Sequence, residues 1–177
     1  MGISESLIDH LRIILRALQE IGVDHALAGG LAFSALVEPR ATVDIDMIIM
    51  LKEEETKSFF PLLEKYFDTL IVHSEPLRFQ AVTIWRAVSV QNSREIILDF
   101  MLAETPFHRN AIERAMELDF FGLRLKVVTP EDLIILKKCA HRPQDMLDIA
   151  TIYKYFGDDI DDDYIERCMK ELDIDEI

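Results

Sequence analysis

The sequence predicts an α+β fold, in which an α/β core made of a small mixed β-sheet flanked by helices is followed by a helical C-terminal appendage. Over residues 1–129, segments with the apolar spacing of helices are interleaved with short runs rich in β-branched and aromatic side chains. From Pro130 onward we find only helical segments. The chain has 177 residues, half of them apolar, which is about the size of one domain. We therefore expect residues 130–177 to pack on the core as part of a single domain.

The first helix is indicated by apolar side chains that recur three or four residues apart. They are Leu7, Leu11, Ile14, Leu15, Leu18 and Ile21. Ser6, followed by Asp9 three residues later, has the pattern of a capping box at the helix start. Gly22 stands where a C-cap glycine is expected. This helix should lie against the sheet.

A glycine turn is expected between the first strand and the second helix. Residues 25–28 predict a short strand that runs into Gly29-Gly30, and residues 31–36 predict a helix that begins at this turn. The free amides of the helix N-terminus would point at whatever occupies the turn. Residues 43–51 then start with alternating acidic and apolar side chains and become wholly apolar, which is typical of a strand whose far end is buried on both faces.

The remaining core elements follow from composition and periodicity. We expect a helix at 52–67, strands at 68–73, 78–90 and 94–102, a helix at 106–118 and a strand at 123–128. The C-terminal appendage should start at Pro130, a favoured first-turn residue, with Thr129 as its cap. The dense acidic run at 158–163 lacks the ligand spacing of a calcium loop, so we interpret it as the loop and first turn of the last helix.

Charge and composition narrow the possible functions. The chain carries 33 acidic and 19 basic residues, a formal charge of −14, which opposes non-specific attraction to phosphate backbones. A long nucleic acid is therefore an unlikely partner, although a local basic patch could hold an RNA end. Cys139 and Cys168 form no metal-binding or CxxC spacing, so we expect reduced thiols in a cytoplasmic protein. No apolar run approaches the roughly 18 to 20 residues of a membrane span, and we expect neither a signal peptide nor an anchor.

The most informative feature is Gly29-Gly30, followed by thirteen residues and then Asp44-Ile45-Asp46. Side chains two apart on a strand share a face, so Asp44 and Asp46 should project together while Val43, Ile45 and Met47 project into packing. Two carboxylates on an apolar strand repel each other unless a cation neutralises them. The pair therefore favours a divalent metal site beside a triphosphate held by the glycine turn. The alternative is a solvated strand face with two ordinary surface acids.

Asp99 is the single interior acid of the strand expected at 94–102. If this strand lies next to that of Asp44, a third carboxylate joins the pair about 5 Å away. Three carboxylates could hold two magnesium ions, one positioning a triphosphate and the other activating an attacking hydroxyl, with Asp99 as ligand and possible base. The alternative for Asp99 is a buried salt bridge to an arginine such as Arg94 or Arg86.

These motifs resemble a known superfamily. The segment from Ala28-Gly29-Gly30 to Asp44-Ile45-Asp46-Met47 is similar to the signature of the nucleotidyltransferase superfamily typified by DNA polymerase beta. Arg40-Ala41-Thr42-Val43-Asp44-Ile45-Asp46 resembles the Arg-x-Ser/Thr-x-Asp-x-Asp form of its AbiEii toxin-like branch. Residues 130–149, in which Lys137 is followed by Ala, Arg, Asp and Asp-Ile, resemble the helical segment of that branch. The two matches occur in order and extend from about residue 26 to residue 149.

The resemblance implies roles for individual residues. Gly29 and Gly30 would contact phosphates, and Lys137 would reach the triphosphate. Magnesium would be bound by the three carboxylates Asp44, Asp46 and Asp99. Many relatives carry Ser or Thr at or just after the second glycine, whereas this chain has Gly30-Leu31, so one hydroxyl contact to phosphate would be missing and backbone amides would replace it.

Other charged residues keep two interpretations. Arg40, grouped with Thr42 in the candidate nucleotide site, could clamp the triphosphate or pair with Glu38 or another acid. Lys137 could bind the triphosphate of the nucleotide, or it could form weak surface ion pairs like its neighbour Lys138. Asp145 and Asp148, together with Arg142, favour a structural network over a second metal site.

The leading hypothesis is a magnesium-dependent nucleotidyltransferase of EC 2.7.7 type that moves an NMP group from an NTP such as ATP to a hydroxyl acceptor. A protein side chain, a small molecule such as an aminoglycoside and an RNA 3′ end all suit this chemistry, and the negative charge favours the non-nucleic acceptors or a basic partner. The alternatives are a catalytically idle binding module, such as a toxin–antitoxin component, and an α+β domain whose acids and glycines are surface and turn residues. A protein partner or a homodimer is possible in each case.

Overall fold

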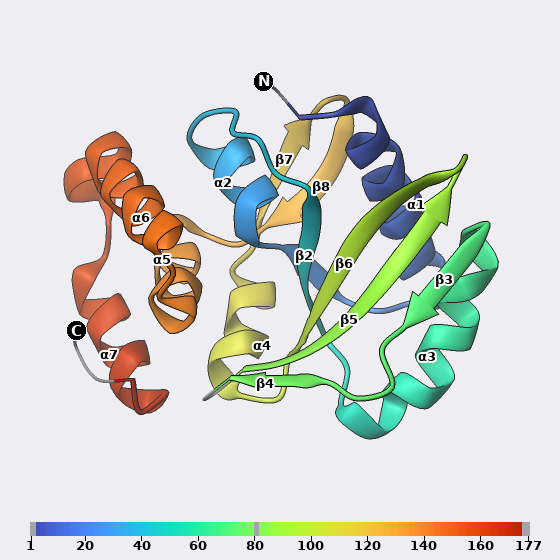
Figure 1. Cartoon of the computed structure of the whole chain (residues 1–177). Helices are drawn as coiled ribbons and strands as arrows, with labels where there is room; N and C mark the ends of the chain where they lie inside the picture. Colours follow the sequence, from blue (N-terminus) through green and yellow to red (C-terminus); the bar gives the residue numbers. More distant parts are fainter. Residues whose placement is uncertain (1–2, 80–81, 175–177) are drawn as a thin grey trace.

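The computed structural model describes residues 3–79 and 82–174 and confirms the α+β fold class, with helices on both sides of one mixed sheet (Figure 1). The strands of this part of the chain are β1 (His25–Leu27), β2 (Asp44–Ile49), β3 (Thr69–Val72), β4 (Leu77–Phe79), β5 (Val82–Gln91), β6 (Arg94–Leu102), β7 (Met116–Phe120) and β8 (Leu123–Val127). The helices are α1 (Glu5–Ile21), α2 (Gly29–Leu36), α3 (Thr56–Leu63), α4 (Pro106–Glu113), α5 (Pro130–Ala140), α6 (Pro143–Phe156) and α7 (Asp162–Glu171), with 3₁₀ turns at Glu53–Glu55, Glu64–Tyr66 and Gly157–Asp159.

The sheet has the strand order β3-β5-β6-β2-β1-β8-β7, and β4 pairs with β5 outside this path. The pairs β2–β6 and β1–β8 are parallel, and the other pairs are antiparallel. The central strands β2 and β6 align Asp46 directly with Asp99. Strand order and register therefore bring the candidate acids of two distant segments together.

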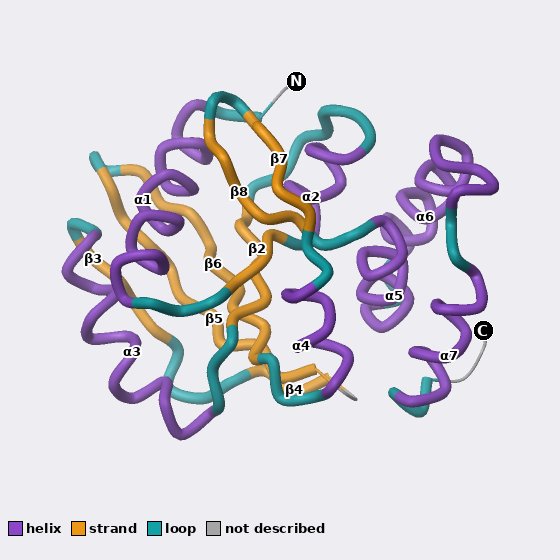
Figure 2. The backbone as a smooth tube through the Cα atoms, turned by 180° about the vertical axis from the view of Figure 1, so that it is seen from behind, coloured by secondary structure: helices purple, strands orange, loops and turns teal. Residues whose placement is uncertain are grey.

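Helices α1 and α3 cover one face of the sheet (Figure 2). The apolar side of α1 is buried there, and Phe100 of β6 meets the ring of Phe59 from α3 at 5.8 Å between ring centroids. The helix ends at Gly22 in the left-handed conformation, as predicted. The predicted cap at Ser6 is wrong: Ser4 is the N-cap, because its side chain accepts a hydrogen bond from the amide of Leu7, while Ser6 is buried within the first turn.

The two faces of β2 differ as expected from the alternation of its side chains. Ile45 and Met47 are buried, and Asp44 and Asp46 project to the other face. The expectation that Val43 packs with the former was wrong, because β2 begins at Asp44 and Val43 lies in the preceding loop with 74% of its surface exposed.

The segment predicted as one strand at 78–90 is instead a pair of antiparallel strands, β4 and β5. Phe79 pairs with Val82 and Leu77 with Ile84, so the chain reverses its direction after Phe79. The helix predicted at 52–67 is also divided, because α3 has a 3₁₀ turn at each end. β-Propensity and helix propensity indicated the right element types here but did not locate these interruptions.

The helix predicted at 106–118 ends at Glu113, and the strand β7 that follows was not predicted. β7 and β8 form a hairpin whose turn residues Phe121 and Gly122 both have positive φ, 52° and 72°. This is the backbone of a type I′ turn, which matches the twist of the two strands. The sequence feature that could have indicated this turn is Gly122, which follows Phe120 and Phe121.

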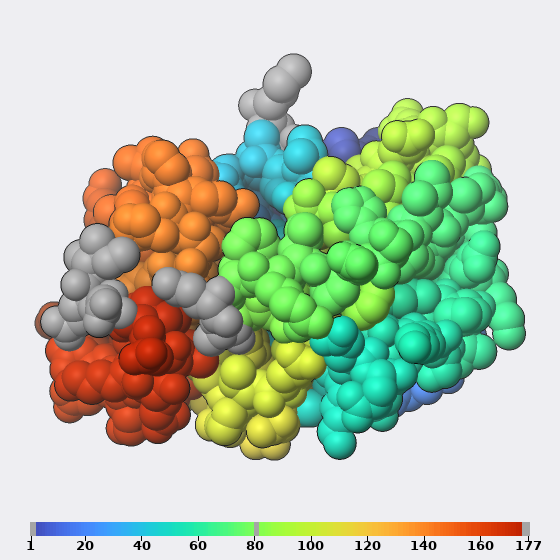
Figure 3. Space-filling model, turned by 60° about the horizontal axis from the view of Figure 1, so that its bottom comes forward, coloured from blue at the N-terminus to red at the C-terminus, as the bar shows by residue number. Residues whose placement is uncertain are grey.

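Helices α5 to α7 lie together at one side of the molecule, directly beside β4 and β5 (Figure 3). Thr129 caps α5 as predicted, and the acidic run forms the 3₁₀ turn and the first turn of α7. A buried hydrogen bond joins α7 to α5, because the Tyr164 hydroxyl donates to Asp132 at 2.6 Å, and the partly exposed Arg114 approaches Asp132 at 3.4 Å. Within the described ranges, no helix is long and apolar enough to cross a membrane.

Candidate active site

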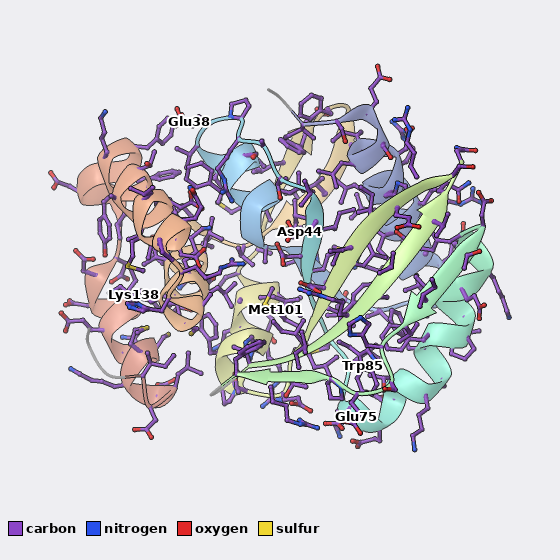
Figure 4. The ribbon with its side chains drawn as sticks, viewed as in Figure 1. Glu38, Asp44, Glu75, Trp85, Met101 and Lys138 are labelled. Carbon is purple, nitrogen blue, oxygen red and sulfur yellow. The ribbon has the colours of Figure 1, made fainter. Side chains whose placement is uncertain are left out.

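The three candidate acids lie together on the face of the sheet opposite α1 and α3. Carboxylate oxygens of Asp44, Asp46 and Asp99 all lie within 4.8 Å of one another. Asp44 and Asp46 project from the start of β2, and Asp99 projects from the neighbouring strand at the register position of Asp46. The adjacency of strands on which the prediction for Asp99 depended is therefore observed, and Asp44 is labelled on β2 in Figure 4.

Asp99 also forms the salt bridge that was its alternative interpretation. Arg86, its cross-strand partner on β5, donates from Nε to Oδ1 at 2.8 Å and from Nη2 to Oδ2 at 2.7 Å. Of the two arginines considered, the partner is Arg86 and not Arg94, which pairs with Gln91 at the far end of the strands. The bidentate pair holds a buried carboxylate in one orientation next to the other two acids.

The three acids make an electrostatically unfavourable group in the protein alone. Burial, followed by the charges of Asp44 and Asp99, raises the pKa of Asp46 to about 7. Asp44 accepts a hydrogen bond from the Thr42 hydroxyl at 2.8 Å, but neither Asp44 nor Asp46 forms an ion pair among the residues that the structure describes. Three clustered carboxylates are the hard oxygen donors that magnesium and similar divalent cations prefer, so the residues fit such an ion.

The glycine turn touches this group. The Ala28 amide donates to the backbone carbonyl of Asp46 at 2.9 Å, and α2 begins at Gly29. Gly29 has a φ of +62°, and a Cβ added there would overlap the Asp46 carboxylate. A Cβ on Gly30 would lie 2.8 Å from the Thr42 hydroxyl oxygen. Both positions therefore need glycine because the acids and Thr42 approach the backbone so closely.

Lys137 is buried, with 3% of its surface exposed, and lies in an ion-pair network of the C-terminal helices. Its Nζ lies 2.5 Å from Asp148 and 3.4 Å from Asp145. Arg40 approaches Asp148 at 3.4 Å, and Arg142 donates to Asp145 at 2.7 Å. The predicted structural network of Asp145 and Asp148 is thus present, and it also holds the two cations, Lys137 and Arg40, that were candidates for the triphosphate.

Phe33 of α2 is a residue of the site that the sequence did not single out. Its buried ring lies 5.6 Å from the guanidinium of Arg40 and 5.8 Å from the Lys137 nitrogen. These are cation–π distances, so the ring contributes to holding both cations beside the glycine turn. The sequence signal was only an apolar position on a helix.

A cavity of about 370 Å³ lies between the glycine turn, the acids of the sheet and Lys137 of α5. Its polar lining consists of Gly29, Asp46, Arg86, Asp99, Lys137, Cys139, Arg142 and Asp145. Its apolar lining consists of Leu77, Phe79, Val82, Ile84, Met101, Leu133, Leu136 and Ala140. The apolar contribution of β4 and β5 was missed because the hairpin that forms it was predicted as a single strand.

Residues 13–176 match the family model described as nucleotidyl transferase AbiEii toxin, type IV toxin–antitoxin system. The chain belongs to this family. It is therefore a nucleotidyltransferase, a transferase of EC 2.7.7 type. The match covers nearly the whole chain, including the glycine turn, the three acids and Lys137.

Solved structures show the same fold at low sequence identity. The solution structure of the antibiotic-resistance factor ANT(2″)-Ia is similar with a TM-score of 0.64 and 15% identity, over 95% of this chain and 91% of that one. The lincosamide antibiotic adenylyltransferase LnuA, solved with lincomycin, has a TM-score of 0.55 and 14% identity over 86% and 98% of the two chains. A nucleotidyltransferase-type protein of Thermotoga maritima, TM1012, has a TM-score of 0.51 and 16% identity over 96% of each chain. No curated protein matches the chain.

Proposed function

We propose that the protein transfers an NMP group from a magnesium-bound NTP to a hydroxyl acceptor. The observation that supports this most directly is the group of Asp44, Asp46 and Asp99 within 4.8 Å, which lies against the glycine turn and in which Asp99 alone has an ion-pair partner among the described residues. Magnesium held by these carboxylates would neutralise them and draw electron density from the α-phosphate. Since NTPs and the reduced thiols of Cys139 and Cys168 belong to the cytosol, we assign the reaction to the cytoplasm.

The triphosphate would lie between the glycine turn and the cations around Phe33. The free amides of Gly29 and Gly30 at the start of α2 can donate to phosphate oxygens. Lys137 lines the cavity, and Arg40 lies near it, because both cations contact Asp148 and the Phe33 ring. The Thr42 hydroxyl next to Gly30 donates its one proton to Asp44, so it would replace the hydroxyl contact that is absent at Leu31 only by giving up this hydrogen bond.

In the transfer step, the acceptor oxygen forms a bond to the α-phosphorus. The bond from this phosphorus to the bridging oxygen breaks, and pyrophosphate leaves with the electron pair. The acceptor proton passes to Asp99, which lies on the side of the acids away from the glycine turn. Arg86 is a positioning residue, because its two hydrogen bonds hold the Asp99 carboxylate for this role while leaving lone pairs free.

A catalytically idle module that acts in a toxin–antitoxin pair is the second candidate, since the family model carries the toxin description. A pure binding role gives no reason to retain three mutually repelling carboxylates next to two glycines that accommodate them. We therefore favour the enzyme, with a cognate antitoxin as a regulating partner.

Calorimetric titration with ATP, GTP, CTP and UTP in the presence of magnesium tests the proposal without knowledge of the acceptor. We expect one or more of them to bind the native protein and to lose binding in Asp44→Asn/Asp46→Asn. The control is Asp158→Asn, which removes a negative charge from an exposed site in the turn before α7. Equal binding by the double variant would contradict the assigned site, and no binding of any triphosphate to the native protein would favour the binding module.

A further inference from the structure

The face of the sheet that carries the acids changes abruptly from polar to apolar. Arg86, Asp99 and Asp46 are register partners on β5, β6 and β2 and form one polar row. The next row on the same face, about 7 Å further along the strands, starts with Met101 and its partner Ile84. Met101 is labelled in Figure 4, toward β4 from Asp44. A ligand that touches Asp99 therefore meets apolar side chains in the next row of the sheet, about 7 Å away.

This apolar row extends over three strands and is faced by a helix. Leu77 of β4 pairs with Ile84, and Phe79 pairs with Val82, so β4 continues the row beyond β5. Across the cavity, α5 contributes apolar residues at helical spacing, namely Leu133, Leu136 and Ala140. We call the eight apolar lining residues of the cavity the apolar wall: Leu77, Phe79, Val82, Ile84, Met101, Leu133, Leu136 and Ala140.

The strand order separates the two reactants. Passing across the sheet, β1 with its glycine turn comes first, then β2 and β6 with the acids, then β5 and β4 with four of the eight residues of the apolar wall. If the glycine turn holds the phosphates, the acids lie between the α-phosphate and the apolar wall. The reacting hydroxyl must approach from the side of Asp99, so the body of the acceptor lies on the apolar wall.

The charges of the cavity argue against a nucleic-acid acceptor. The cations that line it among the described residues each have a carboxylate partner: Arg86 pairs with Asp99, and Lys137 and Arg142 pair with Asp145. A polynucleotide end would need free cations for its phosphates on the acceptor side. A net charge of −14 adds a general repulsion.

We infer that the acceptor is a small, uncharged molecule with a hydroxyl group on an apolar body, and that the apolar wall is its binding site. This inference rests on the proposed function, because it takes the glycine turn as the phosphate site. The cavity volume of 370 Å³ lies near the lower end of the range of pockets for small molecules, so only a small acceptor suits it. Phe79, with 54% of its surface exposed, is a large apolar side chain that such a ligand would cover.

Methyl and amide NMR spectra of the 20.5 kDa protein can test this with 4-propylphenol as the probe. We expect the probe to shift the methyl signals of Ile84 and Met101, and magnesium-ATP to shift the amide signals of Gly29 and Gly30, with both ligands bound together. Phe79→Asp should weaken probe binding about tenfold, because it replaces apolar contact by a charge, and should leave ATP affinity within about twofold. Phe121→Asp is the matched control: Phe121 is 57% exposed, lies on the β7–β8 turn outside the cavity lining, and should change neither affinity.

Three results would overturn the inference. The probe could fail to shift Ile84 and Met101 at concentrations of about 10 mM, where weak apolar ligands bind. Magnesium-ATP could itself shift these methyl groups and exclude the probe, which would make the apolar wall a nucleobase site. A short single-stranded RNA could shift them, which would indicate a nucleic-acid acceptor. Failure of the proposed function is seen separately, as the absence of Asp46-dependent shifts at Gly29 and Gly30 with each of ATP, GTP, CTP and UTP.

Discussion

Two groups of buried or half-buried acids contribute to the lining of one cavity, the sheet group through Asp46 and Asp99 and the helical group through Asp145, and the two groups differ in their partners. In the C-terminal helices, Asp145 has Arg142 and Lys137, and Asp148 has Lys137 and Gln144. On the sheet, Asp99 pairs with Arg86, while Asp44 and Asp46 have no ion-pair partner among the described residues. Both groups are carboxylates in a low-dielectric setting, but within the described ranges both helical acids have a cationic partner, whereas two of the three sheet acids have none.

The pKa values follow this difference. Burial raises the pKa of Asp145, but the hydrogen bonds and charge of Arg142 and the charge of Lys137 outweigh burial and hold this pKa below its usual value. Burial and the two neighbouring acids raise the pKa of Asp46 to about 7. A folded protein that keeps an unbalanced group of acids at a cavity destabilises itself unless a cation binds there. The helical acids are therefore structural, and those of the sheet are the functional candidates.

The largest effect is expected for Asp46→Asn. It removes a metal ligand and should weaken binding of magnesium-NTP at least about a hundredfold, while raising the free energy of unfolding of the metal-free protein at pH 8 because one repelling charge is gone. Calorimetry and urea unfolding in EDTA measure the two quantities. A variant that loses stability along with binding would show that Asp46 is a structural acid like those of the helices.

Asp132→Ala should destabilise the fold strongly without touching the cavity. Asp132 is fully buried and accepts hydrogen bonds from Tyr164 and Thr129, so its removal leaves these donors and the nearby Arg114 without their partner. We expect a loss of about 3 kcal/mol in the free energy of unfolding. Urea unfolding measures it against Asp159→Ala, an exposed acid. A loss below about 1 kcal/mol would contradict the structural role.

Gly29→Ala should cost more than the same change at Gly22. Both glycines have a positive φ, +62° and +82°, so alanine is strained at both by about 1 kcal/mol. At Gly29 the new methyl also displaces the Asp46 carboxylate, and we expect a total cost of about 2 kcal/mol together with loss of magnesium-NTP binding. At Gly22 nothing lies within 4 Å, so binding should be unchanged. Equal behaviour of the two variants would refute the close approach of turn and acid.

A pH dependence of stability with opposite sign is expected at the two groups of acids. The pKa of Asp46 is raised in the folded protein. In EDTA, between about pH 4 and 7, this carboxyl group therefore holds its proton more strongly in the folded than in the unfolded state. The stability that the protonated Asp46 contributes is lost as the pH rises through this window. Asp145 has a lowered pKa, so its contribution is present above about pH 4 and is lost as the pH falls. The free energies of unfolding of the native protein, Asp46→Asn and Asp145→Asn are measured from pH 3 to pH 8. Relative to the native protein, Asp46→Asn should gain about 1 kcal/mol or more as the pH rises, and Asp145→Asn should lose about 1 kcal/mol or more. If the free energies of unfolding of the two variants changed with pH in the same way, the two groups of acids would not differ as described.

Features that depend on a few neighbouring residues were predictable from the sequence. The C-cap at Gly22, the cap at Thr129 and the strand that holds Asp44 and Asp46 on one face follow from local backbone geometry, in which helices repeat every 3.6 residues and strands every two. The thirteen-residue spacing from Gly30 to Asp44 likewise reflects a turn, a short helix and a return to the sheet.

Features that depend on which segments become neighbours required the folded chain. Strand order and register brought Asp99 to Asp46 and chose Arg86, not Arg94, as its partner. The packing of α6 on α5 gave Lys137 its carboxylate partners and brought Asp148 to Arg40, and the reversal after Phe79 built the β4 and β5 part of the apolar wall. Periodicity specifies the direction in which a side chain points along its own element. The group that it meets there depends on long-range pairing and core packing, whose free energy is shared by residues far apart in the sequence.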